Sequence, residues 1–231
     1  MIREINLYAK NSKGKIIHPL EKLILIAIAL VFNGYTKNIN FLILNIILFS
    51  FLSYRLRNPI KIVFKFMCIA VLFFVMSSIT LIFTYSIHEI SIIFLRVLSG
   101  SIIISYLSLT TPLDDIIYVF YKIPIFKDLS DIAKSMERFL ILIEDDFQIT
   151  YKAIKSRGGF NGFKRGISDF GTMCGVVLKN LFHKWRDIDL GLNNRCYTGN
   201  ISYIGIDFNL SKIRIGLIAI YFILSIIVIS I

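Results

Sequence analysis

The chain alternates between long apolar stretches and polar connections. A helix needs about 20 predominantly apolar residues to cross about 30 Å of hydrocarbon. The pattern therefore predicts an all-α membrane protein with about five transmembrane helices. The first two stretches are short, so we expect tilt or local thinning of the bilayer around them. The predicted spans are residues 20–35, 39–54, 62–85, 90–109 and 213–231.

Connections rich and poor in Lys and Arg alternate along the chain, and this alternation predicts an orientation. Cytosolic connections of membrane proteins carry an excess of these residues. The segment before the first span is rich, the next has only Lys37, the one after is rich, and residues 86–89 have none. We therefore predict a multi-pass protein of a bacterial or archaeal cytoplasmic membrane, with a cytosolic N-terminus and an external C-terminus. No cleavable signal peptide is expected, because no small-residue cleavage site follows the first apolar run.

Composition favours the same class of protein. The chain is 56% hydrophobic and 18% charged, whereas a soluble domain is about 45–50% apolar and about 25% charged. Its net charge of +11 could suit nucleic acid, but cytosolic loops account for much of it and no nucleic-acid-binding motif accompanies it. We therefore expect the lipid bilayer, and no nucleic acid, as a partner.

The connection between the fourth and fifth predicted spans is about 100 residues long and contains 15 Lys and Arg residues between positions 110 and 214. This charge predicts a cytosolic location. The domain prediction is a four-span membrane bundle over residues 1–111, a cytosolic helical region over 112–212, and a final transmembrane helix over 213–231.

Two segments of that cytosolic region repeat the same apolar pattern. In each, apolar positions are spaced by four, three, four, four, three and four residues, which is typical of one face of a long amphipathic helix. The two series superpose with a constant offset of 38 residues, and an arginine, Arg157 or Arg195, follows each series by three residues. The positions are Ile132, Met136, Phe139, Ile143, Phe147, Thr150 and Ile154, and then Phe170, Cys174, Val177, Leu181, Trp185, Ile188 and Leu192.

Local signals predict where these helices begin and end. Ser130-Asp131 and Ser168-Asp169 are expected as N-caps with a favourable first-turn acid, and the glycines from Gly158 to Gly166 suit a connection between helices. At about 1.5 Å per residue each helix would be about 40 Å long. A plain helical hairpin packed on itself explains this pattern, with each arginine favoured by the helix dipole. A pair that transmits force to other proteins explains it as well.

Sequence motifs for catalysis are not found. The glycines after Arg157 are not followed by Gly-Lys-Ser/Thr, so no ATP-binding P-loop is predicted. Three histidines lie far apart, and the acids at 144–146 point in different directions on a helix, so neither set predicts a metal site. Cys68, Cys174 and Cys196 are expected as reduced thiols. We expect no enzyme activity, no metal site and no cofactor in this chain.

Arg96 is the charged residue placed well inside a predicted span. A charge in a membrane is a candidate functional residue, although near the outer end of a span its side chain can also reach the interface. Gly100 and Ser101 add small residues to the same helix, which permits close helix packing. These three residues are candidates for contact with another membrane helix, in this chain or in a partner.

Several segments, in the order of the chain, resemble the sequence motifs of one protein family. Gly14–Leu23 leads from glycine through His18-Pro19 to Lys22, and Arg96 is followed by Leu109-Thr110-Thr111-Pro112-Leu113-Asp114-Asp115. Glu137–Glu144 opens the first amphipathic helix, which ends in Ser156-Arg157-Gly158; the second ends in Asn194-Arg195-Cys196. Together they resemble the transmembrane T components of energy-coupling factor (ECF) transporters, the EcfT/CbiQ family. The arginine motifs of that family usually read Ala-Arg-Gly, so Ser156, Asn194 and Cys196 depart from it.

The resemblance implies a function that the residues alone leave open. In this family two ABC-type ATPase subunits each receive one arginine-tipped coupling helix, and a substrate-binding (S-type) membrane subunit packs on the T component. The expected docking residues are Ser156, Arg157, Gly158, Asn194, Arg195 and Cys196.

Other functions remain open from the sequence. The His18-Pro19 start is similar to the cobalt and nickel branch of the family, while a vitamin is an alternative substrate. A self-sufficient permease or channel, with Arg96 in its pathway, is the alternative to a coupling subunit. That alternative predicts polar residues along several spans, and the third and fifth offer little beyond Ser and Thr.

Overall fold

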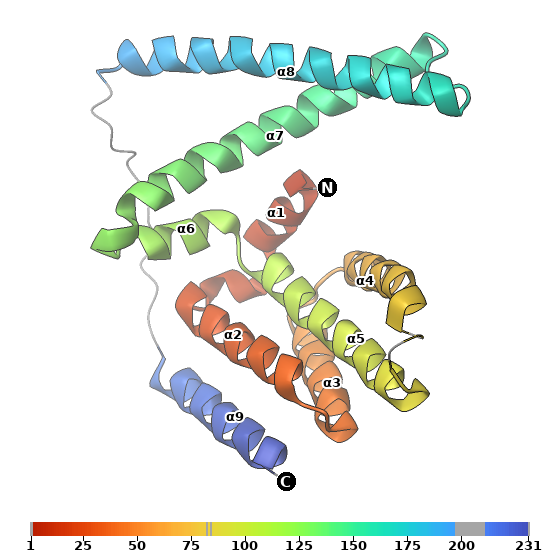
Figure 1. The fold of residues 1–231 in the computed structure, drawn as a ribbon. Coiled ribbons are helices and arrows are strands. Elements are labelled where there is room, and N and C mark those ends of the chain that lie inside the picture. The colour runs from red at the N-terminus through yellow and green to blue at the C-terminus, as the bar shows by residue number, and fades with distance from the viewer. Residues whose placement is uncertain (1, 82, 84, 197–210, 231) are drawn as a thin grey trace. The chain divides into compact units, whose positions relative to one another are not determined.

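The computed structural model describes residues 2–81, 83, 85–196 and 211–230, and every regular element within these ranges is a helix. The elements are α1 (Ile2–Asn11), the 3₁₀ turn η1 (Lys13–Ile16), α2 (Pro19–Tyr35), α3 (Ile39–Arg55), α4 (Ile60–Leu81), α5 (Ile87–Thr110), α6 (Leu113–Tyr121), the 3₁₀ turn η2 (Pro124–Phe126), α7 (Lys127–Ser156), α8 (Phe163–Asn193) and α9 (Lys212–Ser230) (Figure 1).

The chain divides into two compact units. The bundle comprises residues 3–119 together with the C-terminal helix α9, and the long-helix pair lies within residues 120–204. Each unit has its own packing.

Helix α5 is the centre of the bundle, and α2, α3 and α4 pack against it (Figure 1). The buried core joins α2, α3 and α5, and Phe49 meets the ring of Tyr106 edge to face at 5.7 Å. The remaining core residues are Ile26, Ala29, Ile102 and Ile103. These residues lie where the three helices meet, while other apolar residues of the same helices stay exposed.

The helix starts in the bundle follow ordinary capping chemistry. Pro19 occupies the first turn of α2, and the His18 side chain accepts a hydrogen bond from the Leu20 N–H at 3.1 Å. Ser86 and Glu89 form a reciprocal capping box at the start of α5. These caps satisfy N–H groups that have no partner inside a helix.

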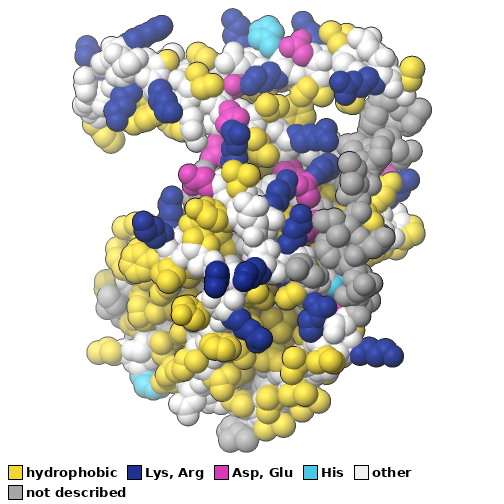
Figure 2. All heavy atoms as spheres, turned by 180° about the vertical axis from the view of Figure 1, so that it is seen from behind, with side chains coloured by type: hydrophobic (Ala, Val, Ile, Leu, Met, Phe, Trp, Pro, Cys, Tyr) yellow, Lys and Arg dark blue, Asp and Glu magenta, His cyan; other side chains and the backbone are white. Residues whose placement is uncertain are grey.

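Two helices, α4 and α5, are long and apolar enough to cross a membrane, and α3 is a shorter apolar helix. No described residue of α4 is buried, as suits a helix that faces lipid. Figure 2 shows hydrophobic side chains covering much of the visible face of the bundle. Helices also form at the other predicted spans, while the count of five spans stays a prediction.

The long-helix pair begins earlier than the sequence predicted. Helix α7 starts at Lys127 and α8 at Phe163, so the predicted N-caps Ser130-Asp131 and Ser168-Asp169 are wrong. The η2 turn leads directly into α7, and the Ser130 hydroxyl donates to the Phe126 carbonyl at 2.7 Å. A hydroxyl bonded four residues back lies inside a helix and caps nothing.

Candidate functional site

The first arginine lies at the end of α7, in a Schellman turn. The Gly158 N–H bonds to the Lys155 carbonyl at 3.1 Å, and the Gly159 N–H bonds to the Ile154 carbonyl at 3.0 Å. Gly158 has a φ of 76°, the left-handed conformation that this turn requires. Arg157 is therefore the last residue before the chain reverses, and it is exposed.

The second arginine lies in a turn with two of the same backbone bonds. The Arg195 N–H bonds to the Leu192 carbonyl at 3.0 Å, as the Arg157 N–H bonds to that of Ile154 at 3.1 Å. The Cys196 N–H bonds to the Asn193 carbonyl at 3.1 Å, in the place of the bond from Gly158. Cys196 also has a positive φ, 53°.

The two ends thus present equivalent arginines 38 residues apart. Arg195 is exposed like Arg157, and among the described residues neither guanidinium has an ion pair. A guanidinium has five donors in a planar fork that suits a carboxylate or several carbonyl groups. Chemically, each end can insert a cation into an acidic or carbonyl-lined groove.

The loop after the first arginine is held from α8. The Asp169 carboxylate accepts a hydrogen bond from the Phe160 N–H at 2.7 Å, and the Phe160 ring packs on Tyr151 with centroids 5.1 Å apart. A Cβ atom placed on Gly159 would lie 2.8 Å from the Ile154 carbonyl oxygen. Asp169, predicted as the first-turn acid of a helix, holds the reversal of the chain instead.

Helices α7 and α8 meet near this loop and diverge away from it (Figure 1). The predicted apolar face of each helix is therefore buried only in part. Val177 is 8% exposed, whereas Met136 is 58% and Trp185 is 58% exposed. A hairpin packed along its whole length would have buried these positions, so an apolar surface remains on both helices.

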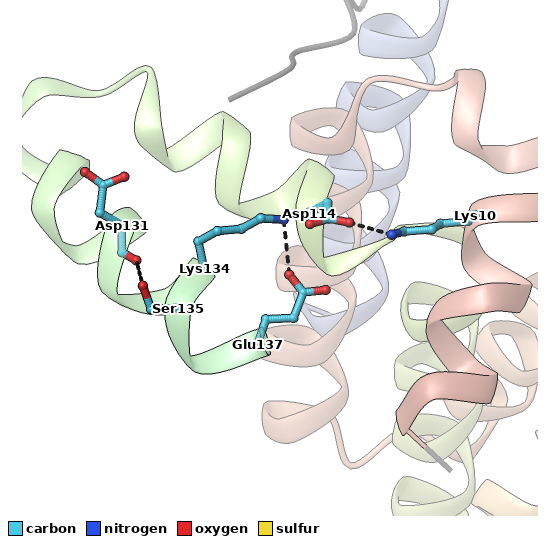
Figure 3. Close-up of polar contacts among 6 residues, drawn as sticks. All are labelled: Lys10, Asp114, Asp131, Lys134, Ser135 and Glu137. Carbon is cyan, nitrogen blue, oxygen red and sulfur yellow. Dashed lines mark hydrogen bonds and ion pairs between the residues drawn. The ribbon is translucent and has the colours of Figure 1, made fainter. Parts of the chain in front are cut away.

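Polar contacts brace the same unit. Lys184 of α8 pairs with Asp146 of α7 at 2.6 Å, so one acid of the 144–146 triplet joins the two helices. Within α7, Lys134 pairs with Glu137 at 3.4 Å, and the Ser135 hydroxyl donates to the Asp131 carbonyl at 3.0 Å (Figure 3).

In the bundle, the structure joins two of the segments that carry the family resemblance. The Lys22 ammonium donates to the Thr110 carbonyl at 2.7 Å and to the Thr111 hydroxyl at 3.3 Å, and Lys22 is only 4% exposed. A Cβ atom on Gly14 would lie 3.1 Å from Thr110 Cβ. The glycine and the lysine of the first segment therefore both serve the close approach of the Thr-Thr turn.

Helix α9 is attached to the same end of α2. The Glu21 carboxylate accepts a hydrogen bond from the Ser211 N–H at 2.9 Å and pairs with Arg214 Nε at 3.3 Å. Farther along α9, the Tyr221 hydroxyl donates to the Asn45 side-chain oxygen at 2.8 Å. These contacts join segments more than 170 residues apart.

The candidates for membrane-helix contact lie inside the bundle. Arg96 donates to the Thr36 carbonyl at 2.8 Å, and the Asn33 amide donates to the Arg96 carbonyl at 3.0 Å. Gly100 lies against the Asn33 side chain, and Ser101 is buried. Arg96 is thus anchored to the end of α2, while contact of these residues with a second subunit stays a prediction.

A charged cluster surrounds the start of α6. Asp114 pairs with Lys10 at 2.7 Å (Figure 3). Burial raises the pKa of the Asp115 carboxyl, and the positive charges of Lys15, Lys22 and Lys10 oppose that rise. No group of three or more His, Cys, Asp or Glu side chains suited to a metal ion occurs in the part of the chain that the structure describes.

Comparison with known proteins identifies the family that has these features. The family model of CbiQ, the cobalt transport protein, matches residues 10–204. The chain belongs to the CbiQ family. Cobalt transport proteins act in membranes, which agrees with the two long apolar helices, and the resemblance to the EcfT/CbiQ family is confirmed.

Two curated relatives are similar to part of this CbiQ-family chain. An uncharacterized protein of Methanocaldococcus jannaschii is 23% identical over 113 residues, which are 49% of this chain and 42% of the relative. A protein of Methanocorpusculum labreanum, named as a fused cobalt transport protein CbiMQ, is 23% identical over 116 residues, 50% of this chain and 19% of that protein. The chain therefore spans less than half the length of either relative.

Sequence reasoning missed the buried polar contacts of the bundle. Lys22 lies at the edge of the first predicted span, and the sequence assigned no partner to Glu21, Asn33 or Asn45. Glu21 and Lys22 are adjacent charges inside an otherwise apolar helix, which was the available signal that both have partners.

Proposed function

We propose that this CbiQ-family chain is the transmembrane coupling subunit of an ECF-type importer. In this role it hydrolyses no ATP itself. Two ABC-type ATPase subunits bind the ends of α7 and α8, and a substrate-binding membrane subunit receives the motion that ATP hydrolysis produces.

The equivalence of the two helix ends carries the proposal. Arg157 and Arg195 are both exposed, both lie at a helix end, and both are followed by a residue with positive φ. A helix C-terminus carries partial negative charge, so a cation there is stabilised before any partner binds. Two matching cationic ends suit a pair of similar ATPase subunits better than a hairpin that serves only itself.

The exposed apolar surface of α7 and α8 supports contact with a second membrane protein. Met136 and Trp185 lie on the two diverging helices and remain more than half exposed. Large exposed apolar patches mark protein or membrane contact surfaces. We assign this surface to the substrate-binding subunit, so that α7 and α8 link that subunit to the ATPases.

The orientation and the substrate follow from weaker signals. The distribution of Lys and Arg supports a cytosolic N-terminus, a cytosolic long-helix pair and an external C-terminus. A relative named as a cobalt transport protein, together with the family, favours a cobalt or nickel ion over a vitamin as the transported substrate.

Co-purification from native membranes tests the docking role. The tagged chain is isolated in detergent beside the double variant Arg157→Glu with Arg195→Glu. We expect the amount of ATPase that co-purifies with the variant to fall at least about 30-fold. Disrupting a buried charge contact costs about 2 kcal/mol or more. Membrane insertion, measured from the amount of chain in the membrane fraction, should not change.

A matched control carries the same change of charge away from the ends. Lys179→Glu with Arg186→Glu alters two exposed cations of α8 and should leave ATPase retention within about twofold of the wild type, as expected for rim charges. The wild type and the double variant could instead both purify without ATPase, and the purified chain could move an ion into liposomes. That result would show that the chain is a permease and would contradict the coupling function.

A further inference from the structure

The turn between α3 and α4 places an arginine where a glycine is favoured. The Arg57 N–H bonds to the Tyr54 carbonyl at 3.0 Å, and the Asn58 N–H bonds to the Ser53 carbonyl at 3.1 Å. These are the two bonds of a Schellman turn, and Arg57 has the left-handed φ of 56° that its central position requires. Strain of this kind persists where the side chain has a use.

That arginine lines an open pocket of about 710 Å³. Arg55 and Lys61 line it as well, and no acidic residue of the described ranges does. Among the described residues none of these three cations has an ion pair. Three unneutralised cations around one pocket attract an anion.

One residue of the same pocket has a buried donor without a partner among the described residues. Asn58 lines the pocket and is 8% exposed. Its side-chain nitrogen is fully buried and has no hydrogen-bond partner within the described ranges. A buried amide left unpaired is unfavourable, so this position is expected to gain an acceptor when a ligand binds.

The pocket lies at the end of a membrane-spanning helix. Helix α4, which begins at Ile60, is one of the two helices long and apolar enough to span. Tyr8 and Tyr54 line the pocket and are 48% and 76% exposed. Tyrosines are enriched where membrane proteins meet the lipid headgroups, and lysine and arginine at that depth attract anionic lipids.

We propose that this pocket binds the headgroup phosphate of an anionic phospholipid. Arg55, Arg57 and Lys61 neutralise the phosphate, and the Asn58 amide donates to one of its oxygens. The acyl chains then lie against exposed apolar side chains of α4, such as Phe64. The inference rests on α4 being a membrane span and does not depend on ATPase docking.

Lipid retention by the purified full chain tests the proposal. The chain is stripped of lipid in detergent, supplied with phosphatidylglycerol, phosphatidylcholine or inorganic phosphate, and measured by native mass spectrometry and thermal unfolding. Phosphatidylglycerol should remain bound and raise Tm. Phosphatidylcholine and inorganic phosphate should be retained less and should raise Tm less.

Variants separate the pocket from general surface charge. Replacing Arg55, Arg57 and Lys61 by Gln should lower the affinity for phosphatidylglycerol about fivefold for each cation removed. Arg57→Gly should raise Tm without lipid, because the strain is relieved, and also reduce the shift that lipid produces. Lys37→Gln, which removes an exposed cation from the α2–α3 connection, is the matched control and should change neither quantity.

Two results would overturn the inference. Equal phosphatidylglycerol binding by the wild type and the triple Gln variant would exclude the pocket as the site. An equal Tm shift with inorganic phosphate would exclude a lipid as the source of the anion. ATPase retention by the same variants reports separately on the docking role.

Discussion

The two arginine-bearing helix ends share two backbone hydrogen bonds and a left-handed residue, which is glycine at the first end and cysteine at the second. Gly158 takes the left-handed conformation after Arg157 without steric penalty, whereas Cys196 takes it after Arg195 against its own Cβ. Because two backbone bonds match, the left-handed turn forms at Cys196 although the residue type does not favour it. The comparison teaches that this turn forms on either residue, at a greater conformational cost for cysteine.

The first end is held by the loop that follows it. Asp169 binds this loop through the Phe160 N–H, and Gly159 allows it to close tightly. These contacts preorganise the first arginine, whereas residues 197–210, which follow the second, lie outside the described residues.

Gly159→Ala should have the largest effect, because it acts on the first helix end and not on the second. The new Cβ would approach the Ile154 carbonyl oxygen at 2.8 Å, and overpacking of this kind costs about 2–3 kcal/mol. Hydrogen exchange should speed up at the last turn of α7 and remain unchanged at the last turn of α8. Gly171→Ala is the control, since nothing lies within 4 Å of its new Cβ; equal effects of the two variants would contradict the close approach.

Asp169→Ala should have an intermediate effect. It removes the 2.7 Å hydrogen bond to the Phe160 N–H, and a bond to a charged acceptor contributes about 1.5 kcal/mol or more. The Phe160 amide should exchange about tenfold faster, which is what that energy implies. Asp187→Ala removes an exposed acid of α8 and should leave this amide unaffected; no change in either variant would mean that the loop holds itself.

Exchanging the residues at the two left-handed positions should have the smallest effect. Cys196→Gly should stabilise the second end by about 1 kcal/mol, and Gly158→Cys should destabilise the first by about as much, because only glycine avoids the Cβ penalty. Local hydrogen exchange at each end measures both. Cys196→Ser keeps a Cβ and should give no gain, so a gain in that variant would point to the thiol and away from the backbone.

The sequence predicted the long helices well because their signals are local and repeated. The apolar period and the 38-residue offset placed Arg157 and Arg195 at equivalent helix ends, where both are found. The helix starts were wrong because Ser130 and Asp169 fit the cap pattern but make other hydrogen bonds. Cap preferences describe residues that compete for several local bonds, and tertiary contacts decide among them.

The polar contacts of the bundle could not be predicted in the same way. Lys22 with Thr110 and Arg96 with Thr36 each join a charged side chain to a backbone carbonyl more than 50 residues away. A carbonyl is present at every position, so no residue type marks the acceptor. The resemblance brought the Lys22 and Thr110 segments to attention, but only the fold shows that they meet.

The divergence of α7 and α8 has a mechanical consequence. A helix of about 30 residues is about 45 Å long at 1.5 Å per residue, so a change of about 10° in the angle at the loop moves its far end by about 8 Å. The ion pair from Lys184 to Asp146 lies between the helices and would be strained by such opening. The two helices thus act as a long lever, in which a small rotation at the loop becomes a large displacement at the far end. The ion pair between them opposes this rotation.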